Sequence, residues 1–177
     1  MLIDSFETSR LQAKRLSSNN YGLLRQIHTD VSTMETLGGI RTEEQTLENL
    51  QWNLKQWEEC NIGLWLFFEK ETKQFIGTAG LRHIDIEGAL EVDLAYVLLS
   101  QFWHRGYGTE MGKACLNIGF DKYKFESIVA GTRSTNFSSQ KVIDKLGFSF
   151  ERAIFKFGHE QFLYRLTKNE FHQTQNN

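Results

Sequence analysis

The stretch 103–109, with the sequence WHRGYGT, constrains the fold of this chain more than any other segment. An apolar stretch at 89–99 precedes it with a strand-like pattern, and an amphipathic segment at 109–123 follows with apolar residues at helical spacing. A second apolar strand pattern follows at 127–132. Two strands joined by one helical crossover lie parallel in one sheet. These four segments therefore predict a mixed sheet built around a strand, loop, helix and strand.

Two glycines, Gly106 and Gly108, lie where the strand gives way to the helix. The first N–H groups of a helix have no partner inside it, and the helix dipole makes that end positive. Glycine lacks Cβ and tolerates positive φ, so the backbone can approach an anion closely. Arg105 adds a positive charge nearby. The pattern indicates a phosphate-binding turn, and the plainer alternative is a tight turn that binds nothing.

Other phosphate-binding motifs fit this chain poorly. The P-loop pattern GxxxxGK[ST] does not occur. The dinucleotide fingerprint GxGxxG is not met, because the glycine after Gly106 and Gly108 is Gly112, one residue too late. No acidic residue ends the following strand to hold a ribose.

The other elements follow from periodicity and capping. Further strands are predicted at 10–16, 64–68, 74–81, 148–157 and 161–167. Helices are predicted at 19–29, from Thr42 with Gln45 completing a capping box, and at 137–146 up to Gly147. The order is strand, two helices, three strands, helix, strand, helix, two strands. It predicts a mixed sheet of seven strands with helices on its faces.

Composition limits the remaining choices. The chain has 177 residues, enough for one domain, which we expect over 1–171 with a polar tail at 172–177. A net charge of -2 argues against a broad electrostatic grip on nucleic acid. Cys60 and Cys115 have no metal or redox spacing, so we expect reduced thiols and no metal. No apolar run reaches transmembrane length, so we expect a cytoplasmic protein without membrane contact.

Three segments carry a family resemblance. The opening TSRLQAKRL at 8–16 is similar to the pattern T-x-R-L…R-x-L. The segment from VDLAY through WHRGYGTE at 92–110 is similar to E-I-G-Y…W-G-K/R-G-Y-A/G-T-E. The segment NFSSQKVIDKLGF at 136–148 is similar to N-x-x-S-x-x-V-L-E-K-L-G-F. Together they resemble the GNAT superfamily of N-acetyltransferases, in particular its ribosomal-protein N-terminal acetyltransferase-like branch. The resemblance implies an α/β (α+β) fold, with a mixed, mostly antiparallel seven-stranded sheet, helices on both faces and a splayed central parallel strand pair.

The resemblance also implies acetyl-CoA as co-substrate and a set of residues that bind it. Backbone groups of the splayed strand would pair with pantetheine, the glycine loop would hold the pyrophosphate, and two polar residues would line the arm and thiol. These residues are Tyr96, Val97 and Leu98, then His104, Arg105, Gly106, Tyr107, Gly108 and Thr109, then Asn136 and Ser139. Three positions depart from the pattern. His104 and Ala95 replace glycines, and Ile143 stands where many relatives outside this branch have a tyrosine general acid.

The resemblance places Asp93 at the position of the family's glutamate, so we expect it to be the general base, acting through a water. Glu91 is the second candidate, because alternate residues of a strand share a face. For either carboxylate, an exposed strand residue without function is the open alternative. Ser139 is the expected proton donor to the thiolate, with an ordinary first-turn helix residue as its alternative. The backbone N–H of Val97 or Leu98 is expected to polarise the acyl carbonyl.

The acceptor is expected to be a small primary amine or a peptide N-terminus, acetylated by direct attack in a ternary complex. A non-catalytic acyl-CoA-binding module and an unrelated nucleotide-binding domain are the alternative functions. A monomer or a homodimer fits the sequence. By fold analogy, 34–41 would form a lip of the acceptor pocket. The large aromatic residues Trp52, Trp57, Trp65 and Phe67 are expected in the core, and His28, His83 and His159 at the surface.

Overall fold

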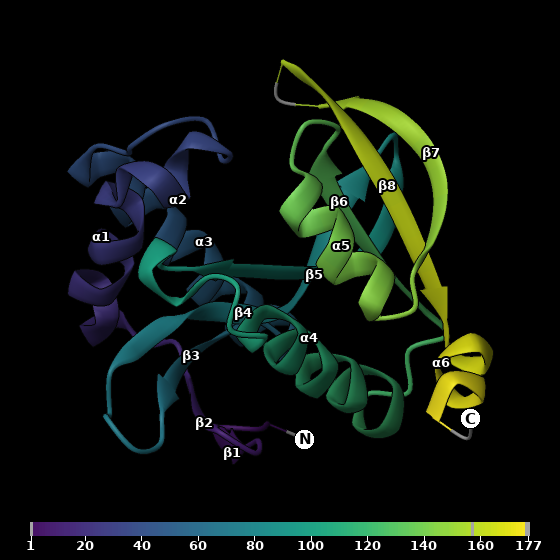
Figure 1. Ribbon diagram of the computed structural model, residues 1–177, viewed down its shortest axis with the longest axis horizontal. Coiled ribbons are helices and arrows are strands. Elements are labelled where there is room, and N and C mark those ends of the chain that lie inside the picture. The colour runs from purple at the N-terminus through teal and green to yellow at the C-terminus, as the bar shows by residue number, and fades with distance from the viewer. Residues whose placement is uncertain (1, 157, 176–177) are drawn as a thin grey trace.

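The computed structural model describes residues 2–156 and 158–175, and one sheet runs through that part of the chain. Its eight strands lie in the order β1-β2-β3-β4-β5-β6-β8-β7 (Figure 1). The strands are β1 Ser5–Glu7, β2 Leu11–Arg15, β3 Leu64–Glu69, β4 Phe75–Ile86, β5 Ala89–Leu98, β6 Ser127–Arg133, β7 Ser149–Lys156 and β8 His159–Thr167.

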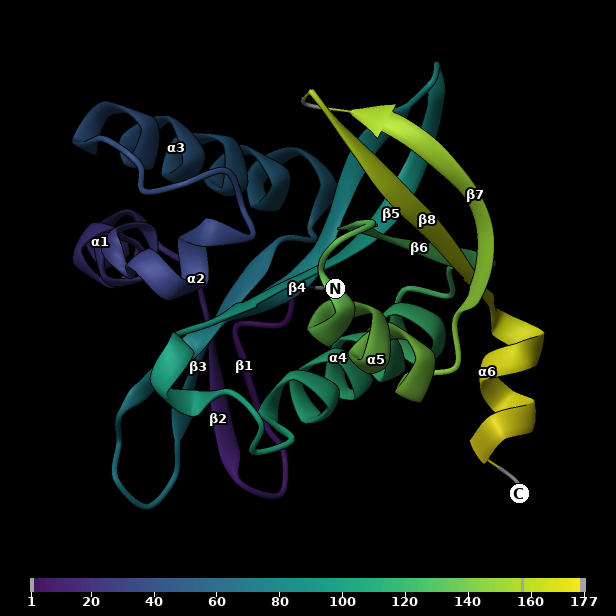
Figure 2. The ribbon, with the colours of Figure 1, turned by 45° about the horizontal axis from the view of Figure 1, so that its top comes forward.

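Helices cover both faces of this sheet. They are α1 Tyr21–Thr29, α2 Val31–Glu35, α3 Glu43–Cys60, α4 Tyr107–Asn117, α5 Phe137–Lys145 and α6 Lys168–Gln175. Figure 2 shows α1, α2 and α3 on one side of the sheet and α4 and α5 on the other. The capping box predicted at Thr42 is confirmed. The Gln45 N–H donates to Thr42 Oγ1 over 3.1 Å, and the Thr42 N–H donates to the Gln45 side chain over 2.9 Å. Gly147 follows α5 with a φ of 89°.

The predicted fold class is confirmed, and the strand count differs by one. The additional strand β1 pairs antiparallel with β2, and its three residues are too few to show a period. Helix α2 was also not predicted, because five residues give barely one turn of pattern. Helix α4 begins at Tyr107, two residues before the predicted start. Helix α6 extends into the predicted polar tail as far as Gln175, while positions 176–177, and Phe157 at the predicted end of a strand, lie outside the described residues.

The centre of the sheet contains the predicted parallel pair, β5 and β6. Within the described residues these strands share one bridge, Asp93 to Val129. On its other side β5 pairs continuously with β4, from Ala89 opposite Ile86 to Leu98 opposite Gly77. The carboxyl half of β5 is therefore paired along one edge, and its other edge opens toward β6.

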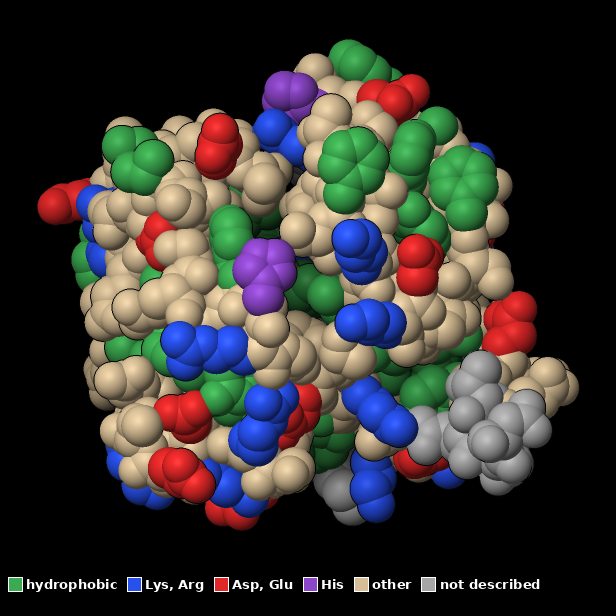
Figure 3. All heavy atoms as spheres, viewed as in Figure 1, with side chains coloured by type: hydrophobic (Ala, Val, Ile, Leu, Met, Phe, Trp, Pro, Cys, Tyr) green, Lys and Arg blue, Asp and Glu red, His purple; other side chains and the backbone are tan. Residues whose placement is uncertain are grey.

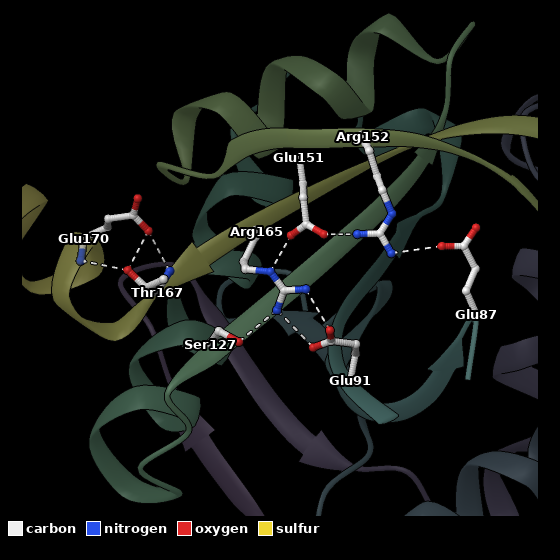
Figure 4. Close-up of polar contacts among 8 residues, drawn as sticks. All are labelled: Glu87, Glu91, Ser127, Glu151, Arg152, Arg165, Thr167 and Glu170. Atoms are coloured by element: carbon white, nitrogen blue, oxygen red, sulfur yellow. Dashed lines mark hydrogen bonds and ion pairs between the residues drawn. The ribbon is translucent and has the colours of Figure 1, made fainter. Parts of the chain in front are cut away.

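A charged network holds the strands together next to this opening (Figure 4). Arg165 on β8 donates two hydrogen bonds, of 2.7 and 3.0 Å, to the carboxylate of Glu91 on β5. It also donates to Ser127 Oγ over 3.0 Å and to the carboxylate of Glu151. One guanidinium thus links β5 to β6 and β7, which braces the joint where the parallel strands meet.

Core packing confirms most of the aromatic predictions. Trp57, Trp65 and Phe67 are buried, and the first two rings meet edge to face with centroids 4.9 Å apart.

Cys60 and Cys115 are free thiols, and burial raises the pKa of Cys115. Across residues 2–156 and 158–175, no helix has the length and apolarity needed to cross a membrane.

Candidate functional site

 The opening between β5 and β6 leads into a cavity of ≈ 1160 Å³. In Figure 3 its mouth is the hollow near the middle of this face, flanked by lysine and arginine side chains on the side of α5. All the predicted site residues line the cavity except Glu91 and Arg105. The lining residues among them are Asp93, Tyr96, Val97, Leu98, His104, Gly106, Tyr107, Gly108, Thr109, Asn136 and Ser139.

The glycine loop has the geometry of an anion-binding turn. Gly106 caps α4 with a φ of 78°, and its side of the helix receives no side-chain cap. The N–H groups of Tyr107, Gly108 and Thr109 have no acceptor among the described residues, and the Glu110 N–H is the first to bond back, to the Gly106 carbonyl over 3.1 Å. Three donors therefore point out of a positive helix end.

His104 holds a backbone conformation that suits glycine better. Its φ is 60°, in the left-handed region where a Cβ is unfavourable. It is one of the two positions, with Ala95, where the sequence has another residue in place of a glycine of the resembled pattern. The loop thus has a backbone conformation typical of glycine at a residue that carries a side chain.

The opening segment of the chain is bound to the first turn of α4. Glu110 accepts hydrogen bonds from Thr8 Oγ1 over 2.6 Å, from the Arg10 N–H over 2.8 Å and from Arg10 Nε over 2.7 Å. Arg10 also donates to the Arg105 carbonyl over 2.9 Å and lies 4.3 Å from the centre of the Tyr107 ring. The opening motif and the glycine-loop motif, about a hundred residues apart in sequence, are therefore in contact. Arg10 compensates the charge of the Glu110 carboxylate, which lies close to the free amides.

The open edge of β5 has a defined set of backbone groups. Successive residues of an antiparallel strand turn their amides to opposite sides. Leu99 donates to the Ile76 carbonyl over 3.0 Å, and a Cβ on Gly77 would overlap the carbonyl oxygen of Val97. The amide of Val97 therefore faces β4, whereas Leu98 turns its N–H toward the opening.

The carbonyl of Leu98 is already engaged on that open side. It accepts from Trp103 Nε1 and from Thr33 Oγ1, each over 3.0 Å. Within the described residues β5 shares no bridge with β6 beyond Asp93, so the Leu98 N–H and both backbone groups of Tyr96 remain for a ligand. Of the two N–H groups expected to polarise an acyl carbonyl, the geometry favours that of Leu98.

Tyr96 and Ser139 bring β5 and α5 together inside the cavity. The phenol oxygen of Tyr96 lies 2.8 Å from Ser139 Oγ and donates to the Ser139 carbonyl over 3.1 Å. Burial raises the pKa of Tyr96 to about 12, so the phenol is protonated at neutral pH. Asn136 uses its Oδ1 to cap α5, accepting from the Ser139 N–H over 3.1 Å.

Asp93 and Glu91 share a face of β5, but their surroundings differ. The Asp93 side chain is 8% exposed and lines the cavity, with Oδ2 2.5 Å from Arg82 Nη2. Its other carboxylate oxygen has no hydrogen-bond partner within the described residues. Glu91 is held by Arg165, and hydrogen bonding to that guanidinium lowers the pKa of Glu91. Asp93 therefore has an oxygen available to the cavity, and Glu91 does not line it.

The opposite wall, from α1, α3 and β4, contains residues that the sequence did not predict for the site. His28, expected at the surface, is 5% exposed because α1 packs it against α3. Its Nδ1 lies 3.0 Å from Thr46 Oγ1, which itself donates to the Thr42 carbonyl, so Nδ1 carries the hydrogen. Burial, with the charges of Arg41 and Arg25, lowers the pKa of His28 to about 4.

Trp52 also differs from its predicted place in the core. It is 39% exposed and lines the cavity, with the Arg82 guanidinium carbon 5.3 Å from the centre of its ring. The helical period of α3 places apolar residues on one face, and it does not show that part of this face borders a cavity. The predicted lip at 34–41 contributes Met34, Leu37 and Arg41 to the lining.

The chain is similar to known acetyltransferases in sequence and in fold. Residues 10–149 match the model of the acetyltransferase (GNAT) domain. The chain is 28% identical over 147 residues to the uncharacterized protein YkkB of Bacillus subtilis, covering 83% of this chain and 84% of that one. An acetyltransferase from Agrobacterium tumefaciens has the same fold, with a TM-score of 0.81, 20% identity and coverage of 94% and 95%. The ribosomal L7/L12 alpha-N-protein acetyltransferase RimL, solved with coenzyme A, has a TM-score of 0.73 and 16% identity to this chain, with 90% of this chain and 95% of that one covered.

Proposed function

This chain belongs to the GNAT acetyltransferase family, and from that premise we propose that it transfers the acetyl group of acetyl-CoA to a primary amine. The observation that carries the proposal is one cavity with two kinds of group on its walls. The free amides of Tyr107, Gly108 and Thr109 can bind a diphosphate, and the carboxylate of Asp93 can accept a proton. A module that only binds acyl-CoA would have no use for a carboxylate held in this way.

The residues present fit acetyl-CoA along the α4 and α5 side. The loop at 104–109 would hold the diphosphate, with Arg105, Lys141 and Lys145 as the nearby cations. The open backbone groups of Tyr96 would pair with pantetheine amides, as an added strand pairs with a sheet edge, which leaves the Leu98 N–H for the acyl group. Asn136 and Ser139 would lie along the arm that ends in the thiol.

The proposed chemistry divides between the two faces of β5. Acetyl-CoA supplies an activated acetyl group. Asp93 takes the proton of the amine through a water, while Arg82 holds the other carboxylate oxygen in place. The Leu98 N–H polarises the acyl carbonyl. Ser139 passes a proton to the departing thiolate and regains one from solvent, and the hydrogen bond between its Oγ and the phenol oxygen of Tyr96 positions the hydroxyl.

Calorimetry and a thiol-release assay test the proposal together. We expect heat on titration with acetyl-CoA, and release of free thiol that depends on an added amine from a panel of peptides, polyamines and aminoglycosides. Heat without thiol release for any amine would favour the non-catalytic module, and no heat at all would remove the proposed activity.

Two variants test the proton donor. Ser139→Ala is expected to lower kcat about tenfold to a hundredfold while the affinity for acetyl-CoA stays the same. Tyr96→Phe removes the positioning hydrogen bond and is expected to lower kcat less than Ser139→Ala does. Equal activity of all three proteins would leave the thiolate to take its proton from solvent.

A further inference from the structure

The cavity reaches the α1 to α3 side of the molecule through a wall rich in arginine. Arg41, Arg82 and Arg133 line it, and we call these three residues the arginine cluster. The acidic residues of the lining are Asp93, which is paired with Arg82, and Asp85, which is exposed. Within the part of the chain that the structure describes, neither Arg41 nor Arg133 forms an ion pair with a carboxylate.

Arg41 is half-buried beside groups that cannot balance its charge. Its Nη1 lies 3.5 Å from Nε2 of the neutral His28, and its carbonyl accepts from Arg25 over 2.7 Å. Burial and the charge of Arg82 lower the pKa of Arg41. A partly buried guanidinium next to a second one is unfavourable unless an anion pairs with it.

Arg133 approaches the same mouth from the opposite side. It ends β6, and its Nη2 lies 3.4 Å from the place that a Cβ on Gly38 would occupy. Gly38 belongs to the loop that leads to Arg41, so the side chain spans from β6 to the α2–α3 connection. On the β4 wall, Arg82 Nε is buried without a hydrogen-bond partner among the described residues. Arginine side chains thus border one space from two directions, and within the described residues Arg41 and Arg133 have no carboxylate partner there.

An outer groove continues from this wall, so an elongated acceptor could extend out of the cavity through it. It has a volume of ≈ 640 Å³ and shares Leu37, Arg41, Asn49 and Trp52 with the cavity. Glu48, the acidic residue of this groove, is exposed and forms no ion pair with Arg41. Room beyond the cluster suits an acceptor longer than a single amino acid.

We propose that the acceptor is a peptide whose free N-terminus is followed closely by an acidic side chain, and that the arginine cluster binds this carboxylate. The proposal rests on the proposed acetyl transfer and names its substrate class. A guanidinium offers two parallel N–H donors to a carboxylate, so Arg41 is the central contact. The amine then lies on the Asp93 side of Arg82. Polyamines and aminoglycosides, which carry several positive charges, are disfavoured by the same wall.

The test compares peptides of equal length that begin Ser-Asp or Ser-Asn, with spermidine as a cationic amine. For the wild-type protein, we expect kcat/KM for the Ser-Asp peptide to be at least about tenfold higher than for the Ser-Asn peptide. Arg41→Gln should raise KM for the acidic peptide about tenfold to a hundredfold, and leave KM for acetyl-CoA and the rate with the Ser-Asn peptide unchanged. Arg41→Lys should recover part of the loss, since it keeps the charge without the fork.

Lys55→Gln is the matched control. Lys55 is an exposed cation on α3 that pairs with Glu59, so its loss changes the net charge equally and should change no kinetic constant. Equal use of the two peptides, a preference for spermidine, or an equal loss on both peptides in Arg41→Gln would overturn the inference. The comparison of the two peptides with the wild-type protein needs no variant, so it tests the inference even if Arg41→Gln folds poorly. Thiol release with neutral amines alone would overturn only the acidic acceptor, whereas no heat with acetyl-CoA would overturn the proposed function as well.

Discussion

The two sides of the cavity are built from different materials. On the α4 and α5 side, the donors are backbone amides, at Tyr107 to Thr109 and at Leu98. On the α1 to α3 side, the wall consists of charged and aromatic side chains that come from segments far apart in the chain, such as Arg41 and Arg82. The backbone side follows from local spacing of glycines, so one stretch of sequence reveals it. The side-chain side exists only once the sheet and helices have assembled.

The largest expected effect lies at Asp93. Asp93→Asn should lower kcat about a hundredfold to ten-thousandfold and alter its pH profile, because the general base is lost. The affinity for acetyl-CoA should stay the same, since the backbone side is untouched. Steady-state kinetics and calorimetry on one preparation measure both. Unchanged turnover would remove Asp93 from this role.

Glu91→Gln is the companion variant, on the same face of β5. It breaks the hydrogen bonds to Arg165 and is expected to lower the free energy of unfolding, with kcat changed only a few-fold. If Glu91→Gln lost activity as severely as Asp93→Asn, the distinction drawn from their surroundings would be wrong.

His28 gives the side-chain wall a pH dependence. Its pKa is lowered to about 4, so the folded state favours the neutral ring. The stability from this residue is fully present above the ordinary pKa of about 6.5 and is lost as pH falls from there toward 4, by up to about 3 kcal/mol. Urea unfolding of the wild type and His28→Gln at pH 7 and pH 5 measures it. An identical loss in both proteins would assign the pH dependence to other groups.

Gly106 tests the backbone side directly. At a φ of 78°, a β-branched residue is strained, so Gly106→Val should weaken acetyl-CoA binding about tenfold. KM for the amine should change little. Gly22→Ala is the control, because a Cβ there meets nothing within 4 Å. Calorimetry with acetyl-CoA gives both affinities, and an unchanged affinity in Gly106→Val would separate the loop from the coenzyme.

Arg10 is expected to give the smallest effect. Arg10→Gln leaves Glu110 uncompensated beside the free amides, so the affinity for acetyl-CoA should fall a few-fold. The double variant Arg10→Gln with Glu110→Gln should recover most of it, because the repelling charge is gone. If the double variant binds no better than the single one, Arg10 acts by another route than charge compensation.

The sequence predicted the fold and the glycine turn at the start of α4 because both depend on local pattern. Strand periods, the capping box at Thr42 and the glycines around α4 each act over a few residues. It did not predict β1 or α2, since three and five residues carry too little period. It included Arg41 in the predicted lip at 34–41 without predicting a role for its side chain, and it placed His28 at the surface, because the surroundings of both depend on how α1, the α2–α3 loop and α3 pack together.

One missed contact did have a signal. Glu87 and Gly88, with φ values of 54° and 88°, form a two-residue turn between β4 and β5. Counting outward from this turn places Arg82 opposite Asp93, as the register has it. The prediction ended β4 at 81, and so the cross-strand partner of the proposed base was overlooked.

The bridge between Asp93 and Val129 has a mechanical consequence. If the two halves of the sheet tilt against each other, atoms near this rung move least, and those at Leu98 move most. The proposed base would then keep its position while the slot beside Leu98 widens or narrows around a ligand. The group that abstracts the proton would stay in a fixed position, and the slot at the carboxyl end of β5 would adjust to ligands of different width.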